Sequence, residues 1–119
     1  MDYVWVNKME KIEKTIRYTS LYNAYHSLLS DSQKNVINDY YFADLSLSEI
    51  AQNRGISRAA VEDALLKGCN KLDELEEKLH VVEKSGNLRE KILVLREKSL
   101  NQSEVDEIDE LLKELEYGI

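Results

Sequence analysis

The chain has 119 residues, of which 43% are hydrophobic and 33% charged, so it is apolar enough to bury a core and too polar to span a membrane. No run of eighteen apolar residues occurs, and the first residues, MDYVWVNKME, lack the basic flank and cleavage site of a secretory signal, so we expect a cytoplasmic protein with no membrane insertion. The 16 basic and 23 acidic residues give a net charge of −7, which opposes binding to a phosphate backbone, and no third of the chain is basic.

Helix is the only regular structure that the sequence predicts. There is no proline, there are four glycines, and apolar residues recur at spacings of three and four, which is typical of an all-α fold. We expect one domain over 1–119. The first helix is predicted from Lys8 to Leu29, with an apolar stripe made of Met9, Ile12, Ile16, Leu21, Tyr22, Tyr25, Leu28 and Leu29.

Two serines have the spacing of helix-capping boxes. In such a box the serine hydroxyl accepts a hydrogen bond from the backbone amide three residues later, and the side chain of that later residue accepts one from the serine amide. The first is Ser30 with Gln33, so a second helix is expected to begin near Asp31. The other is Ser46 with Glu49, which predicts a short helix from Leu47 to Arg54.

The segment after Arg54 has the residues of a tight turn between two helices. Gly55 can adopt the left-handed conformation that ends a helix, Ile56 can fill the turn, and Ser57 can cap the next helix. This predicts a helix-turn-helix core over 30–80. Its small hydrophobic core is expected to comprise Ile50, Ala51, Ile56 and Val61.

A long third helix is expected to run from Arg58 to His80. Gly68 lies inside it, which indicates either close approach of another backbone or a local kink. Alternating steps of three and four give the helix a coiled-coil-like apolar row of Val61, Leu65, Gly68 or Cys69, Leu72, Leu75 and Leu79.

A helical extension is predicted over 86–117, beginning after the break at Ser85–Gly86–Asn87. The apolar pattern breaks again near Asn101 to Ser103, so the extension is either a helical hairpin or one bent helix. Together with the row on the third helix, the stripe from Val105 to Leu115 offers more apolar edge than a three-helix domain needs. We therefore expect a homo-oligomer, most simply a homodimer.

The helix-turn-helix segment 45–61 is similar to domain 4 of bacterial sigma factors. Over about residues 10–85 the chain contains a series of short motifs: Glu13-Lys14-Thr15, Leu28-Leu29 before Gln33, Tyr40-Tyr41, Asp44-Leu45-Ser46-Leu47, Glu49-Ile50-Ala51, Ser57-Arg58, Ala60-Val61, Asp63 and Glu77-Lys78-Leu79-His80. Together these motifs resemble the YlxM family of small bacterial helix-turn-helix proteins. The resemblance implies a role in the signal recognition particle pathway, because members are usually encoded beside genes of that particle.

The sequence departs from that family where DNA would be read. The family commonly has glutamine, tyrosine and a basic pair at the positions of Ala59, Glu62, Leu66 and Lys67. Neither Ala59 nor Leu66 can hydrogen-bond to a base edge, and only Arg58 suits bidentate contact with guanine. Alternatively, Arg58 pairs with Glu62 four residues later. The candidate nucleic-acid-binding residues are Ser57, Arg58, Glu62, Asp63 and Lys67.

The other chemically capable side chains favour structural roles. His26 and His80 have no metal-ligand spacing around them, and Cys69 is expected to be a small buried hydrophobe. We expect no metal, no cofactor and no catalysis, because no phosphate loop or catalytic grouping occurs. Helix packing is expected, rather than base stacking, for Tyr18, Tyr22, Tyr25, Tyr40 and Tyr41.

Three functions follow from these features. The first is a regulatory factor of the signal recognition particle pathway that binds protein, or RNA, with protein favoured because no basic face is present. The second is a DNA-binding transcriptional regulator that places residues 57–67 in the major groove as a dimer. In the third, the helix-turn-helix is a purely structural module within an oligomer.

Overall fold

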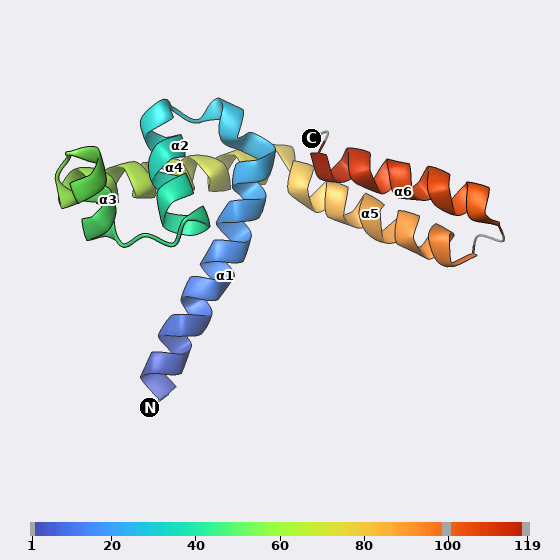
Figure 1. The fold of residues 1–119 in the computed structure, drawn as a ribbon, viewed down its shortest axis with the longest axis horizontal. Helices are drawn as coiled ribbons and strands as arrows, with labels where there is room; N and C mark the ends of the chain where they lie inside the picture. The colour runs from blue at the N-terminus through green and yellow to red at the C-terminus, as the bar shows by residue number, and fades with distance from the viewer. Residues whose placement is uncertain (1, 99–100, 118–119) are drawn as a thin grey trace. The chain divides into compact units, whose positions relative to one another are not determined.

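A computed structural model describes residues 2–98 and 101–117, with side chains for 9–98 and 101–115, and it is helical throughout these ranges apart from short turns (Figure 1). The all-α prediction is confirmed. Residues 1–78 and 79–119 form two compact units. No described helix is both long enough and apolar enough to cross a membrane. The elements are α1 (Asp2–Tyr25), η1 (His26–Leu28), α2 (Asp31–Ile37), η2 (Asn38–Phe42), α3 (Leu47–Arg54), α4 (Arg58–Leu79), α5 (Val81–Lys98) and α6 (Gln102–Tyr117).

The first unit places α2 and α3 against α4, and the first half of α1 extends beyond them (Figure 1). The predicted capping box at the start of α2 is present, because the Gln33 amide donates to the Ser30 hydroxyl at 3.2 Å and the Ser30 amide donates to the Gln33 side chain at 3.1 Å. These local bonds begin α2 at Asp31, as the sequence predicts.

The apolar stripe predicted for the first helix divides between two faces of α1. Leu21 and Tyr25 are buried, whereas Met9, Ile12 and Ile16 are between 57% and 63% exposed. Ile12 and Ile16 each lie nine residues before a buried residue, which is two and a half turns and therefore the opposite side of the helix. The residues of the predicted stripe are therefore not one continuous buried face, since Met9, Ile12 and Ile16 form an exposed apolar side of α1.

Helix α4 crosses the unit with its predicted apolar row turned inward as far as Leu72. Val61 and Leu72 are fully buried. A Cβ on Gly68 would lie 2.7 Å from Cδ1 of Ile37, so the glycine allows α2 to approach α4 closely while α4 remains one helix. Neither alternative predicted for Gly68 is observed as stated, because α4 continues without a break and the atoms that approach the glycine are side-chain atoms of Ile37 and Gln33 rather than backbone. The helix ends at Leu79, one residue earlier than predicted.

The second unit is a hairpin of α5 and α6, which decides between the two predicted forms of the extension. The expected break at Ser85–Gly86–Asn87 is wrong, because α5 continues through it from Val81. A single glycine on an exposed helix surface costs about 1 kcal/mol relative to alanine, which the surrounding helix can absorb. The predicted break near Asn101 is the turn, where the Asn101 side chain accepts a hydrogen bond from the Glu104 amide at 2.9 Å.

Candidate functional site

Local hydrogen bonds build the helix-turn-helix. The amide of Glu49 donates to the Ser46 hydroxyl and the amide of Ser46 donates to the Glu49 carboxylate, both at 3.1 Å, so α3 begins at Leu47. Gly55 ends α3 with a φ of +66°, in the left-handed region that favours glycine. The Ser57 hydroxyl then accepts from the Ala60 amide at 3.0 Å and starts α4. Both predicted caps and the glycine turn are confirmed.

Buried side chains from α2, α3 and α4 hold the angle between the two helices of the motif. The predicted core members Ile50, Ala51 and Val61 are buried. Ile56 is 40% exposed, so its predicted place in this core is wrong. It follows the left-handed glycine, where the chain turns along the surface. The core cluster comprises Val36, Ile50, Ala51, Val61 and Ala64.

An ion pair without a local sequence signature joins α3 to η2. Arg54 donates to both carboxylate oxygens of Asp39, at 2.6 and 3.1 Å, and the Asp39 side chain is only 15% exposed. The hydrogen bond to Asp39 raises the pKa of Arg54. The two hydrogen bonds hold the Arg54 guanidinium against Asp39, beside the turn. No local pattern links residues fifteen positions apart, which is why sequence reasoning missed it.

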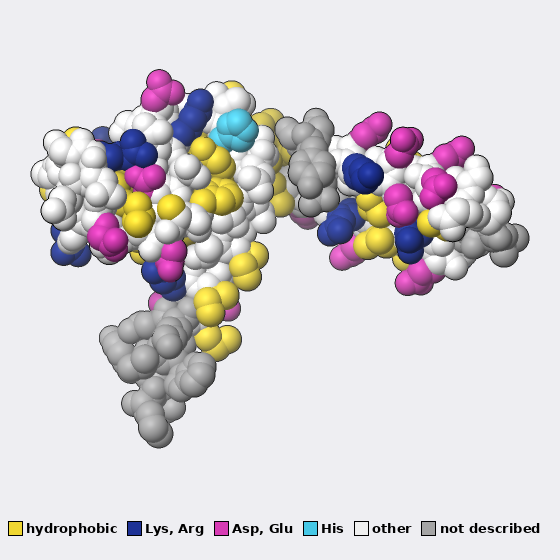
Figure 2. All heavy atoms as spheres, viewed as in Figure 1, with side chains coloured by type: hydrophobic (Ala, Val, Ile, Leu, Met, Phe, Trp, Pro, Cys, Tyr) yellow, Lys and Arg dark blue, Asp and Glu magenta, His cyan; other side chains and the backbone are white. Residues whose placement is uncertain are grey.

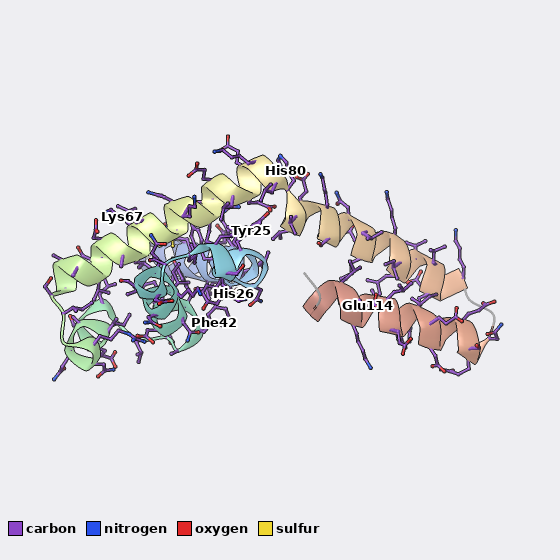
Figure 3. All side chains as sticks on the ribbon, turned by 90° about the horizontal axis from the view of Figure 1, so that it is seen from above. Tyr25, His26, Phe42, Lys67, His80 and Glu114 are labelled. Atoms are coloured by element: carbon purple, nitrogen blue, oxygen red, sulfur yellow. The ribbon has the colours of Figure 1, made fainter. Side chains whose placement is uncertain are left out.

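The candidate nucleic-acid-binding residues lie at the start and along the outer side of α4. Ser57, Arg58, Glu62, Asp63 and Lys67 are all exposed. Lys67 lies on the side of α4 that faces away from α2 and α3 (Figure 3). The structure therefore brings the predicted residues onto one accessible surface, which we call the α4 outer face: Ser57, Arg58, Ala59, Glu62, Asp63, Leu66 and Lys67.

Each cation of the α4 outer face is paired with a carboxylate one helical turn away. Arg58 Nε lies 3.2 Å from Glu62 Oε1, which is the alternative predicted for this arginine, and Lys67 Nζ lies 3.0 Å from Asp63 Oδ2. The face thus carries two positive and two negative charges. Basic and acidic side chains are also interspersed over the visible side of the first unit (Figure 2).

Between these ion pairs the α4 outer face is apolar. Leu66 is 60% exposed, Ala59 is exposed on the same side of the helix, and Ile56 is exposed in the preceding turn. The α4 outer face therefore lacks the excess positive charge that a DNA-reading helix presents to the phosphate backbone.

The tyrosines pack within the first unit, as predicted. The rings of Tyr18 and Tyr41 lie 5.5 Å apart, and those of Tyr40 and Tyr41 lie 4.8 Å apart. Tyr25 is buried and donates to Glu76 at 2.6 Å, while Tyr22 contacts Phe42. Tyr25, His26 and Phe42 gather where α1 ends beside η2 (Figure 3).

A second polar cluster joins α1 to α4. Arg17 and Tyr18 donate to different oxygens of Asp73, at 2.7 and 2.8 Å. Burial, reinforced by the bond to Asp73, raises the pKa of Tyr18 to about 12. Arg17 and Tyr18 lie more than fifty positions from Asp73 in the sequence, so only the fold brings them together. The cluster fixes α1 on α4, and all of its polar groups have partners.

The remaining reactive side chains are one buried cysteine and two exposed histidines. Cys69 is buried, as predicted, and burial raises the pKa of its thiol to about 11, so it stays protonated at neutral pH. His26 stacks on Tyr22, and Nδ1 of His80 lies 3.0 Å from Glu83. Among the residues whose side chains the structure describes, no three His, Cys, Asp or Glu side chains group to hold a metal ion.

Comparison with known proteins identifies the family of this chain. The sequence model of the UPF0122 family, described as "Putative helix-turn-helix protein, YlxM / p13 like", matches residues 12–114. The UPF0122 protein YlxM of Bacillus subtilis is 37% identical over 105 residues, which cover 88% of this chain and 96% of that protein. A UPF0122 protein of Shouchella clausii is 36% identical with the same coverage. One of Mycoplasma capricolum is 39% identical over 103 residues, 87% of this chain and 84% of the relative. The chain therefore belongs to the UPF0122 family of YlxM-like helix-turn-helix proteins.

Proposed function

We propose that this protein is a regulatory factor of the signal recognition particle pathway that works by binding protein through the α4 outer face. The observation that carries the proposal is the pairing of Arg58 with Glu62 and of Lys67 with Asp63 around the exposed Leu66. The pathway follows from the YlxM family resemblance. A cytoplasmic location is part of the proposal, and catalysis is not.

The charge balance, more than the ion pairs themselves, argues against DNA. An exposed pair four residues apart on a helix contributes only about 0.3–0.5 kcal/mol, so a phosphate could displace Glu62 from Arg58. The two carboxylates would nevertheless stay beside the DNA backbone, and their repulsion would offset the attraction of the two cations. A protein partner with mixed charges meets no such opposition.

Leu66 is suited to be the central contact. A leucine that is 60% exposed loses most of its water contact when a partner covers it, and charged residues around it can set the orientation of that partner. Since the α4 outer face carries as many acidic as basic side chains, we favour a protein component of the pathway over its RNA.

Binding assays with purified components test this proposal. The full chain is mixed separately with the particle's GTPase, its receptor and its RNA, and association is measured by titration. We expect binding to a protein component that Leu66→Lys weakens at least about tenfold, the loss expected when a buried apolar contact is replaced by a desolvated charge. Leu93→Lys, at another exposed leucine that lies on α5, is the matched control and should leave binding unchanged.

Absence of binding to any of the three components would refute the proposed role. Equal loss in the Leu66 and Leu93 variants would show that the α4 outer face is not the binding surface.

A second candidate is a DNA-binding regulator, because Ser57, Arg58, Glu62, Asp63 and Lys67 are exposed after a correctly formed turn. It requires affinity that falls steeply with salt and depends on Arg58. Under this alternative Arg58→Ala weakens binding to duplex DNA, whereas Glu62→Gln strengthens it by removing repulsion. If low-salt affinity is negligible, or if Arg58→Ala has no effect, this alternative loses its mechanism.

A further inference from the structure

The α5–α6 hairpin leaves a row of leucines exposed on one of its faces. Only Ile92 is buried among the described residues of α5, whereas Leu88 and Leu95 on α5 and Leu111 on α6 are between 48% and 59% exposed. All four lie on or next to the apolar rows along which the two helices meet. Two helices alone cannot enclose such rows, because each helix is covered from one side only.

These three leucines lie on the same face of the hairpin. Arg96 of α5 and Asp109 of α6 form an ion pair at 2.9 Å, which marks one face. At 100° per residue, Leu88 and Leu95 lie to the opposite side of Ile92 from Arg96. On α6, Leu111 likewise lies to the opposite side of the contact row from Asp109. One face of the hairpin therefore carries the Arg96–Asp109 pair, with Leu93 on the same side of α5, and the opposite face, which we call the leucine face, carries Leu88, Leu95 and Leu111.

Rows of opposite charge border the leucine face. On α5, the residues four positions before and three positions after each leucine of this face are lysines. On α6, the residues four positions before and three positions after Leu111 are glutamates. More broadly, α5 has five basic and three acidic residues, while α6 has one basic and seven acidic residues. The bordering residues, all exposed, are Lys84, Lys91 and Lys98 on α5 and Glu107 and Glu114 on α6.

The Arg96–Asp109 pair also sets the levels of these charges along the hairpin. Lys91 lies five residues before Arg96 and Glu114 five residues after Asp109, so they are level with each other. Lys98 lies two residues after Arg96 and Glu107 two residues before Asp109, so these two are also level with each other. Within one hairpin, the lysines and glutamates of these two rows form no ion pair with one another.

We propose that the leucine face is covered by the same face of a second copy of this chain, so that two hairpins form a four-helix bundle in which α5 of each copy lies over α6 of the other. A twofold axis parallel to the helices produces this arrangement and places each lysine row over a glutamate row at matching levels. The other face-to-face arrangement would stack lysines on lysines and glutamates on glutamates.

The charge pattern is what points to a second copy. A face with a basic border along one helix and an acidic border along the other is complementary to itself after a twofold rotation, whereas a partner with one sign of charge would match only half of it. An 18-residue α5 is about 27 Å long, enough for more than two heptads of contact in each helix. The proposal uses none of the residues on the α4 outer face, so it stands or falls independently of the proposed function.

Sedimentation equilibrium of the full chain tests the proposal through a charge exchange. We expect the unmodified protein to be dimeric. The double variants Lys91→Glu/Lys98→Glu and Glu107→Lys/Glu114→Lys should each dissociate at least about tenfold more readily, because like charges then face each other. An equimolar mixture of the two variants should recover the dimer, since opposite charges face each other again, and this recovery also shows that both variants are folded.

Variants on the exposed face of α1 provide the control. Ile12→Lys/Ile16→Lys alters an apolar patch of similar exposure in the other unit and should leave the dimer intact. A monomeric unmodified protein overturns the proposal, as does a dimer that both charge variants leave unchanged. Dissociation caused by the α1 variant but not by the hairpin variants, or a mixture that fails to recover the dimer, overturns it as well.

Discussion

The first unit and the α5–α6 hairpin have the same spacing of apolar residues along their helices. The apolar side chains are nevertheless buried to different extents in the two units. Ile37, Ile50 and Leu72 are completely buried in the first unit, whereas Leu88 and Leu95 of the hairpin remain about half exposed. The difference is in the number of helices around each apolar row. In the first unit α4 is covered by helices from more than one direction, whereas α5 contacts α6 along one side. Apolar periodicity thus identifies a helix face that can be buried, and the number of neighbouring helices decides how much of it is.

Truncation of one leucine in each unit should give the largest contrast. Leu72→Ala removes a fully buried side chain and should lower the free energy of unfolding by about 2–5 kcal/mol. Leu88→Ala should cost less than about 1 kcal/mol in the monomer, because its side chain already contacts water. Urea denaturation at a concentration low enough to keep the chain monomeric measures both, and equal losses would contradict the difference in burial.

Replacing a glycine by alanine should have opposite effects on stability in the two units. Gly68→Ala puts a Cβ 2.7 Å from Cδ1 of Ile37 and should destabilise the protein by about 1–3 kcal/mol. Gly86→Ala meets nothing within 4 Å and should stabilise α5 by about 0.5–1 kcal/mol through its helix propensity. Thermal unfolding followed by circular dichroism gives the sign of each change. A stabilising Gly68→Ala would mean that the Ile37 side chain can move aside without cost.

Loss of a helix cap should have a smaller effect that stays within its own unit. Ser46→Ala removes the acceptor for the Glu49 amide and should cost about 1 kcal/mol in the first unit. Asn101→Ala removes the corresponding acceptor at the start of α6 and should increase amide exchange there while leaving exchange in α3 unchanged. Hydrogen exchange resolved along the chain distinguishes the two. Increased exchange in α3 on loss of Asn101 would show that the units unfold together.

Alkaline pH should affect the first unit alone through its buried thiol. Burial raises the pKa of Cys69 from 9.0 to about 11, so the folded protein resists ionisation that the unfolded chain permits. The resulting stability is complete below about pH 9 and is lost as the pH rises toward 11. In Cys69→Ala, the fall in the free energy of unfolding between pH 9 and 11 should be smaller, as measured by urea denaturation at each pH. An unchanged pH dependence would mean that the thiol is not the group responsible.

Most of the candidate site could be predicted because its construction is local. Ser46, Gly55 and Ser57 act on backbone groups within a few positions of themselves, and the exposure of Arg58 and Lys67 follows from the same helical register as the burial of their neighbours. Ile56 was predicted incorrectly because its burial depends on the direction in which the chain leaves the turn. The Asp39–Arg54 pair has no local signature at all.

The sequence by itself determined where α2, α3 and α4 begin, since each start depends on a side chain that bonds to the backbone three residues away. It also determined the family and the charge balance of the α4 outer face. Only the tertiary structure decided which face of α1 is buried, why Gly68 is needed in α4, and that Arg17, Tyr18 and Asp73 meet. These features depend on contacts between residues far apart in the chain, whose positions are fixed by the packing of whole helices and not by any local pattern.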